Sequence, residues 1–145
     1  MAEITLTIFG EPASKSNSRR AVKIGNMPRV IKSQKAMDYT KQFRLQLPND
    51  VEPLTQPVRA DITIWYASRR PDLDESLILD LLQVDEKKYK DTKGVILNDR
   101  QVREKHVYWG LDKANPRCEI YLVENADLDA RPQKRARKPL ATRLD

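Results

Sequence analysis

Alternation of apolar and polar residues predicts several half-buried strands along the chain. In the first of them, Ile4, Leu6 and Ile8 occupy every second position, and Gly10 and Pro12 then end the pattern. A period of two places successive side chains on opposite faces of a sheet. The strands predicted in this way occupy about residues 2–9, 58–66, 103–110 and 117–123, with shorter ones at 21–24, 29–31 and 95–97.

Two other segments have the spacing of amphipathic helices. Ser33 is a predicted N-cap for a helix that presents Tyr39 and Phe43 on one side, and Pro48 ends it. A second helix follows Glu75, and a polar loop at 85–94 comes after it. The apolar face of this second helix would consist of Leu77, Ile78, Leu81 and Val84. The order of elements predicts an α+β fold, with a mixed β-sheet covered by two main helices.

Length and composition narrow the class of protein. A chain of 145 residues fits one domain, which we expect at 1–125, followed by a disordered basic tail at 126–145. No apolar run could cross a membrane and no signal pattern opens the chain, so we expect a cytoplasmic protein without a membrane partner. The single Cys118 fits a small core residue, because one cysteine cannot form a disulfide within a chain. Only four glycines are present, without a phosphate-binding motif, so no nucleotide cofactor is expected.

The formal charge of +6 is distributed unevenly. Residues 1–44 carry +6, residues 45–130 carry −5, and residues 131–145 carry +5. Seven basic residues and no acid lie between Lys15 and Lys35, together with small polar residues that can bond phosphate. A solvated surface loop is the ordinary explanation of such a run, but the absence of acids favours DNA. The predicted DNA contacts are Lys15, Asn17, Arg19, Arg20, Lys32, Arg69 and Arg70.

Three aspartates are the candidate catalytic residues. Asp72 and Asp74 follow Pro71 at the end of the central strand, and Asp99 follows the short apolar segment 95–97. Side chains two residues apart point the same way in an extended backbone, which Pro71 favours. Two carboxylates about 5 Å apart repel by about 3 kcal/mol at an effective dielectric of about 20, and a bound divalent cation reverses this cost. Oxygen-only ligands suit Mg²⁺ or Mn²⁺, so the pattern predicts a metal-dependent nuclease.

These residues carry a resemblance to a known family. The Asp72-Leu73-Asp74 motif before a helix, the later stretch from Ile96 to Val102, and an N-terminal strand followed by Gly10-Glu11-Pro12 and Ser16-Asn17 resemble the RusA-like Holliday junction resolvases. The likeness covers roughly residues 3–123. It implies a homodimeric endonuclease that cuts paired strands of four-way DNA junctions with Mg²⁺ or Mn²⁺, in a bacterium or a phage-infected host cell. It also implies that Asp72, Asp74 and Asp99 are both the catalytic residues and the metal ligands.

The chain departs from the family pattern beside these aspartates. Where the family has an asparagine and then, one helical turn on, a lysine implicated in cleavage, this chain has Glu75 and Ile78. Lysines of the loop at 85–94 could supply the missing cation from another part of the backbone. Two alternative functions therefore stay open: a nuclease for forks or flaps, and a DNA-binding protein that has lost cleavage.

Overall fold

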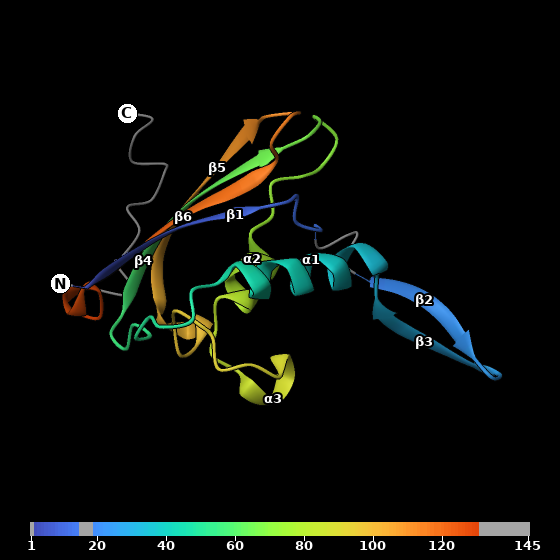
Figure 1. Ribbon diagram of the computed structural model, residues 1–145, viewed down its shortest axis with the longest axis horizontal. Coiled ribbons are helices and arrows are strands. Elements are labelled where there is room, and N and C mark those ends of the chain that lie inside the picture. Colours follow the sequence, from blue (N-terminus) through green and yellow to red (C-terminus); the bar gives the residue numbers. More distant parts are fainter. Residues whose placement is uncertain (1, 15–18, 131–145) are drawn as a thin grey trace, which may run out of the picture.

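A four-stranded mixed sheet forms the centre of the protein in this computed structural model, which describes residues 2–14 and 19–130. Its strand order is β1-β6-β4-β5, and β4 pairs in parallel with β5 and antiparallel with β6 (Figure 1). The strands are β1 (Glu3–Phe9), β4 (Val58–Tyr66), β5 (Val102–Leu111) and β6 (Arg117–Glu124). The prediction of a single α+β domain with a mixed sheet is thereby confirmed.

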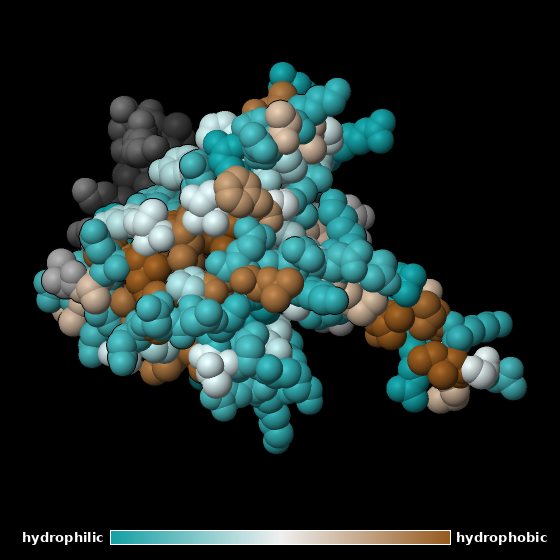
Figure 2. All heavy atoms as spheres, in the orientation of Figure 1, coloured by the Kyte–Doolittle hydropathy of each residue, from teal (hydrophilic) through white to brown (hydrophobic). Residues whose placement is uncertain are grey.

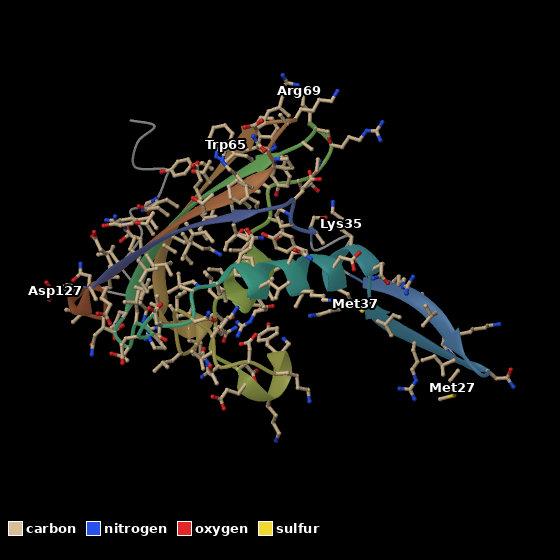
Figure 3. The ribbon with its side chains drawn as sticks, viewed as in Figure 1. Met27, Lys35, Met37, Trp65, Arg69 and Asp127 are labelled. Carbon is tan, nitrogen blue, oxygen red and sulfur yellow. The ribbon has the colours of Figure 1, made fainter. Side chains whose placement is uncertain are left out.

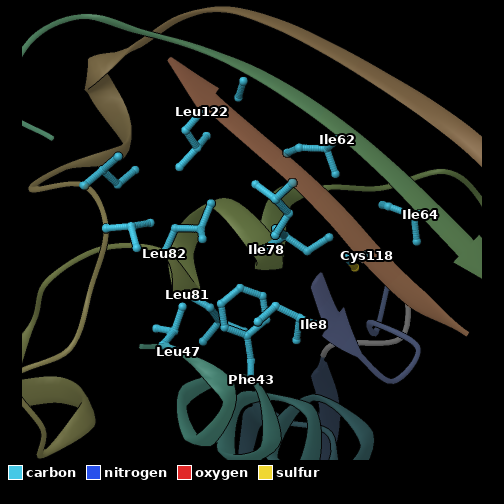
Figure 4. Packing of buried hydrophobic residues seen from close by; sticks show 14 of the residues in the cluster. Ile8, Phe43, Leu47, Ile62, Ile64, Ile78, Leu81, Leu82, Cys118 and Leu122 are labelled. Carbon is cyan, nitrogen blue, oxygen red and sulfur yellow. The ribbon is translucent and has the colours of Figure 1, made fainter. Parts of the chain in front are cut away.

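The two main helices cover one face of this sheet. Every second residue of β4, from Val58 to Tyr66, is buried toward α1 (Gln34–Gln46) and α2 (Ser76–Leu81). Phe43 of α1 and Ile78 of α2 are fully buried between the layers (Figure 4). Burying side chains of this size contributes about 1.5–3 kcal/mol each, so this face is the main source of stability.

Two local predictions in this layer are confirmed. The Ser33 side chain accepts a hydrogen bond from the Ala36 N–H and so caps α1. Cys118 is a fully buried core residue within hydrogen-bond distance of the Tyr39 hydroxyl, and burial raises the pKa of its thiol to about 12. Cys118 is therefore an unreactive packing residue.

A separate two-stranded sheet projects from the body of the molecule. It consists of β2 (Arg19–Ile24) and β3 (Met27–Lys32), which pair antiparallel around a turn at Gly25 and Asn26 (Figure 1). Gly25 has a φ of +63°, a conformation that glycine adopts without steric cost. Both strands are longer than the alternating patterns at 21–24 and 29–31 predict, because the pairing continues through Arg19 and Arg20 of β2 and through Met27, Pro28 and Lys32 of β3.

The segment after α2 differs from the prediction. The loop expected at 85–94 contains the short helix α3 (Glu86–Tyr89), which the Asp85 side chain caps. The prediction of a strand at 95–97 is wrong, because Ile96 forms only isolated bridges with Leu54 and Gln83. Periodicity of three apolar residues cannot distinguish a strand from a buried crossing segment.

The end of the described chain also corrects a boundary. Residues 126–130, expected to be disordered, include a 3₁₀ turn at Ala126–Leu128, and Leu128 is buried. The Asp129 carboxylate pairs with Arg103 of β5 at 2.6 Å. The domain therefore continues to at least residue 130, and the rest of the predicted tail, 131–145, lies outside the described residues. Within 2–14 and 19–130, no helix has the length and apolar character to cross a membrane.

Candidate active site

A core tyrosine holds the backbone of the acidic pair. Tyr66, the last residue of β4, is buried, and its hydroxyl donates to the Asp72 carbonyl at 3.0 Å and accepts from the Asp74 N–H at 3.2 Å. Burial raises the pKa of this phenol, so it stays protonated at neutral pH and keeps its donor. The chain from 72 to 75 is neither helix nor strand, and this single hydroxyl ties both aspartates to the sheet.

The two side chains of the pair have different surroundings. The Asp72 carboxylate is exposed to solvent. One Asp74 oxygen accepts from the Ser76 N–H at 3.0 Å and from the Ser76 hydroxyl at 2.6 Å, at the first turn of α2. Asp74 thus stabilises the chain at the start of α2, whose N-cap residue is Glu75, through its two bonds to Ser76.

The third aspartate is held by a compact set of side-chain bonds. Gln101 accepts from the Leu97 and Asn98 N–H groups and donates to the carbonyls of Leu54 and Gln56. This fixes the short 3₁₀ turn Asp99–Gln101. The Asp99 N–H donates to the Gln83 side chain at 3.2 Å, just past the end of α2. The side-chain amide of Gln101 thus has a structural role, because its hydrogen bonds hold the segment that carries Asp99.

A lysine from β5 connects the two acidic regions. The Lys105 ammonium pairs with the Glu75 carboxylate at 2.6 Å, and the Glu75 side chain is only 16% exposed. Lys105 and Asp99 line one surface pocket of about 220 Å³ together with Leu79 of α2. In the parallel register Lys105 lies opposite the buried Ala60, on the helix-covered face of the sheet. Lys105 therefore pairs with the residue that follows Asp74 and also lines a pocket with Asp99.

Sequence reasoning missed Lys105. The available signal was its position two residues before Val107, on the apolar face of a strand pattern where a lysine is unexpected. Ile78, at the family's lysine position, is fully buried. Among the loop lysines, Lys93 donates to the Arg44 and Leu45 carbonyls at the end of α1.

The donor chemistry of the aspartates suits a hard cation, since all of their ligand atoms are oxygens. Their side chains are distributed over two segments beside α2, with Asp74 at its start and Asp99 past its end. Among the described residues, no three histidine, cysteine, aspartate or glutamate side chains come together as a ready metal site. The structure thus holds the backbone of each acidic region separately and does not bring the three carboxylates together.

The predicted DNA contacts lie in two places. Arg69 and Arg70 are exposed in the turn that follows β4, immediately before the acidic pair (Figure 3). Arg20 is exposed on β2, and Lys32 is half-buried at the end of β3. Arg19 begins β2, but its side chain is not among those described, and Lys15 and Asn17 lie outside the described residues.

A scan of known protein families and a search of curated proteins each found no match to this chain.

Proposed function

We propose that the protein is a metal-dependent endonuclease that hydrolyses branched DNA, with four-way junctions as its preferred substrate. The observation that carries the proposal is the pocket shared by Asp99 and Lys105, with Lys105 paired to Glu75 next to Asp74. Carboxylates for a cation, and a cation for phosphate charge, are what phosphodiester hydrolysis requires. The resemblance to RusA-like resolvases, which rests in part on Asp74 and Asp99, supports this assignment.

Asp72, Asp74 and Asp99 would hold Mg²⁺ or Mn²⁺ in this proposal. A bound divalent ion would lower the pKa of a water molecule and offset negative charge on the scissile phosphate. The Tyr66 hydroxyl fixes the backbone of the pair, and Gln83 and Gln101 fix that of Asp99. The three carboxylates belong to two separately held segments, at the start of α2 and past its end, and these segments would have to approach for one ion to bind all three.

Lys105 would supply the positive charge that Ile78 cannot. When water oxygen bonds to phosphorus and the bond to the leaving oxygen breaks, negative charge increases on the phosphoryl oxygens. The Lys105 ammonium, on a residue that lines the same pocket as Asp99, can offset part of that charge, and it pairs with Glu75 at 2.6 Å. In this proposal Lys105 takes the role expected of a loop lysine; Lys93, one of the four lysines of that loop, is engaged with carbonyls of α1.

Exposed arginines next to the pair would hold the substrate. Arg69 and Arg70 immediately precede the acidic segment, so phosphates bound there would lie close to Asp72. A second copy of the chain, related by two-fold symmetry, would present a second set of carboxylates to the paired strands of a junction.

Variants of Asp72 and Asp99 test the assignment. Asp72→Asn and Asp99→Asn should each abolish cleavage of a labelled four-way junction in Mg²⁺ and keep or tighten junction binding. Asp50→Asn, a change at an exposed aspartate in the loop after α1, is the matched control and should cleave at the parent rate. Folded variants that cleave normally, or that lose binding together with cleavage, would contradict the proposal.

A further inference from the structure

The β2–β3 hairpin exposes apolar side chains that a solvated loop would not need. Ile24, Met27 and Val30 are 56%, 62% and 64% exposed, and they lie on an arm that stands clear of the body (Figure 2). Its six-residue strands span about 20 Å at about 3.3 Å per residue. An isolated two-stranded hairpin is marginally stable in water, so an arm of this kind gains most from a partner.

The charge of the arm indicates the chemistry of that partner. Between residues 19 and 32 there are five basic residues and no acid. The ion pairs found among the described residues include none with Arg20, Lys23 or Arg29. Cores of protein interfaces are depleted in charged residues, whereas DNA-binding surfaces are rich in them. The arm therefore suits a nucleic acid better than an apolar protein surface.

The strand register gives the arm an apolar tip above basic positions. Ile24 and Met27 are directly paired next to the turn, and Val22 pairs with Arg29 below them. Met27 is labelled near the tip in Figure 3. Isoleucine and methionine are among the side chains that proteins insert between stacked base pairs. Basic residues further down the ribbon can meanwhile contact the flanking phosphates.

We propose that this arm binds along DNA through its basic residues and inserts the Ile24 and Met27 pair between bases. Insertion is least costly where stacking is already interrupted, so a branch point is the favoured location. The preference for a branch rests on the proposed function, but insertion itself does not require cleavage. The arm would then help the protein distinguish a junction from a continuous duplex.

Fluorescence of 2-aminopurine placed at the centre of a four-way junction tests insertion. The full-length protein, without divalent metal, should raise the fluorescence as the base loses its stacking. Replacing the tip pair together, Ile24→Ser with Met27→Ser, should abolish the rise and weaken junction binding about 10-fold. Leu45→Ser, at a 63% exposed apolar residue of α1, is the matched control and should behave as the parent.

A second variant separates the basic residues from the tip. Arg20→Ala with Arg29→Ala should lower the slope of log affinity against log salt by about 2, yet keep the fluorescence rise at saturating protein. A tip variant that still unstacks the base would overturn the inference. So would a parent dimer that the tip variant turns into a monomer by sedimentation, since the arm would then be a protein interface. Failure of the proposed function is distinguishable, because it removes cleavage and leaves unstacking unchanged.

Discussion

Arg44 is a buried cation that fastens the region behind the candidate site. It is 5% exposed and donates at 2.8 Å to the carbonyls of Leu81, Gln83 and Lys93. It also pairs with Asp91 and lies over the Tyr89 ring at 4.2 Å. Because the Gln83 side chain accepts a bond from the Asp99 N–H, this guanidinium supports the residue that positions Asp99. The sequence does not predict this role, because an arginine on an amphipathic helix is expected on the solvent-exposed face.

We expect Arg44→Ala to lower the free energy of unfolding by about 3–5 kcal/mol, because it leaves buried carbonyls and Asp91 without their partner. Urea denaturation at neutral pH measures this, with the exposed Lys41→Ala on the same helix as a control that changes it by less than about 0.5 kcal/mol. The hydrogen bond from Arg44 holds the pKa of Asp91 below its ordinary value of 3.8.

A carboxyl group whose pKa is lower in the folded state than in the unfolded state stabilises the fold when the pH is above its unfolded-state pKa. This stabilisation is lost as the pH falls through the folded-state pKa. The difference between the parent and Arg44→Ala should therefore narrow below pH 3.8. If the difference in unfolding free energy between parent and variant stays constant down to the pH of acid unfolding, the hydrogen bonds to carbonyls, and not the ion pair with Asp91, account for the lost stability.

Lys105→Ala tests the assignment of the cation to β5. We expect single-turnover cleavage of a saturated junction to fall about 10²-fold, because one preorganised charge near the phosphate is lost, while affinity changes little. Lys113→Ala, in the turn after the same strand, is a control that should keep the rate. A parent-like rate for Lys105→Ala, with a large loss for Lys87→Ala, Lys88→Ala, Lys90→Ala or Lys93→Ala, would return the role to the loop.

At the scale of elements, the alternation of apolar and polar residues was sufficient to predict the four strands of the main sheet. Strands β1, β4, β5 and β6 lie within a residue or two of their predicted positions; β1, β4 and β6 have one face more buried than the other, whereas only Gly110 is buried in β5. The crossing segment at 95–97 and helix α3 were missed for a different reason. Ile96 is buried without belonging to a sheet, and Tyr89 of α3 packs against Arg44, which lies 45 residues away in sequence.

The candidate site was predictable only in part. A motif of two aspartates before a helix is visible in the sequence, and so is the Asn98-Asp99-Arg100-Gln101 stretch. The pairing of Glu75 with Lys105 depends on the parallel register of β4 and β5, which no local pattern specifies. Likewise, nothing local indicates that the Tyr66 hydroxyl holds both aspartates.

Helix α2 gives a further prediction at this scale. Ile78→Lys restores the residue of the family pattern but places an ammonium where the side chain is fully buried. We expect the free energy of unfolding to fall by several kcal/mol and the cleavage rate not to rise. Thermal unfolding and single-turnover kinetics on the same preparation measure both. A faster and normally stable Ile78→Lys enzyme would mean that the site lacks the cation assigned to Lys105.

At the scale of the whole molecule, the charge is separated between basic ends and an acidic centre. Residues 131–145 carry six basic residues and one acid. Deleting them should weaken binding to junction, fork and duplex alike, and should reduce the slope of log affinity against log salt, because up to six phosphate contacts disappear. Titrations at several salt concentrations measure the slope. An unchanged slope would assign the tail to another partner.

The central claim is that the acidic regions beside α2 form a metal-dependent centre for branched DNA. The most direct measurement incubates the purified full-length protein with labelled four-way junction, fork and linear duplex, each with and without Mg²⁺ or Mn²⁺. We predict symmetric cuts in the junction, only with metal, and little or no cleavage of the duplex. Tight binding without products under every metal condition, or equal cleavage of all three substrates, would contradict the account.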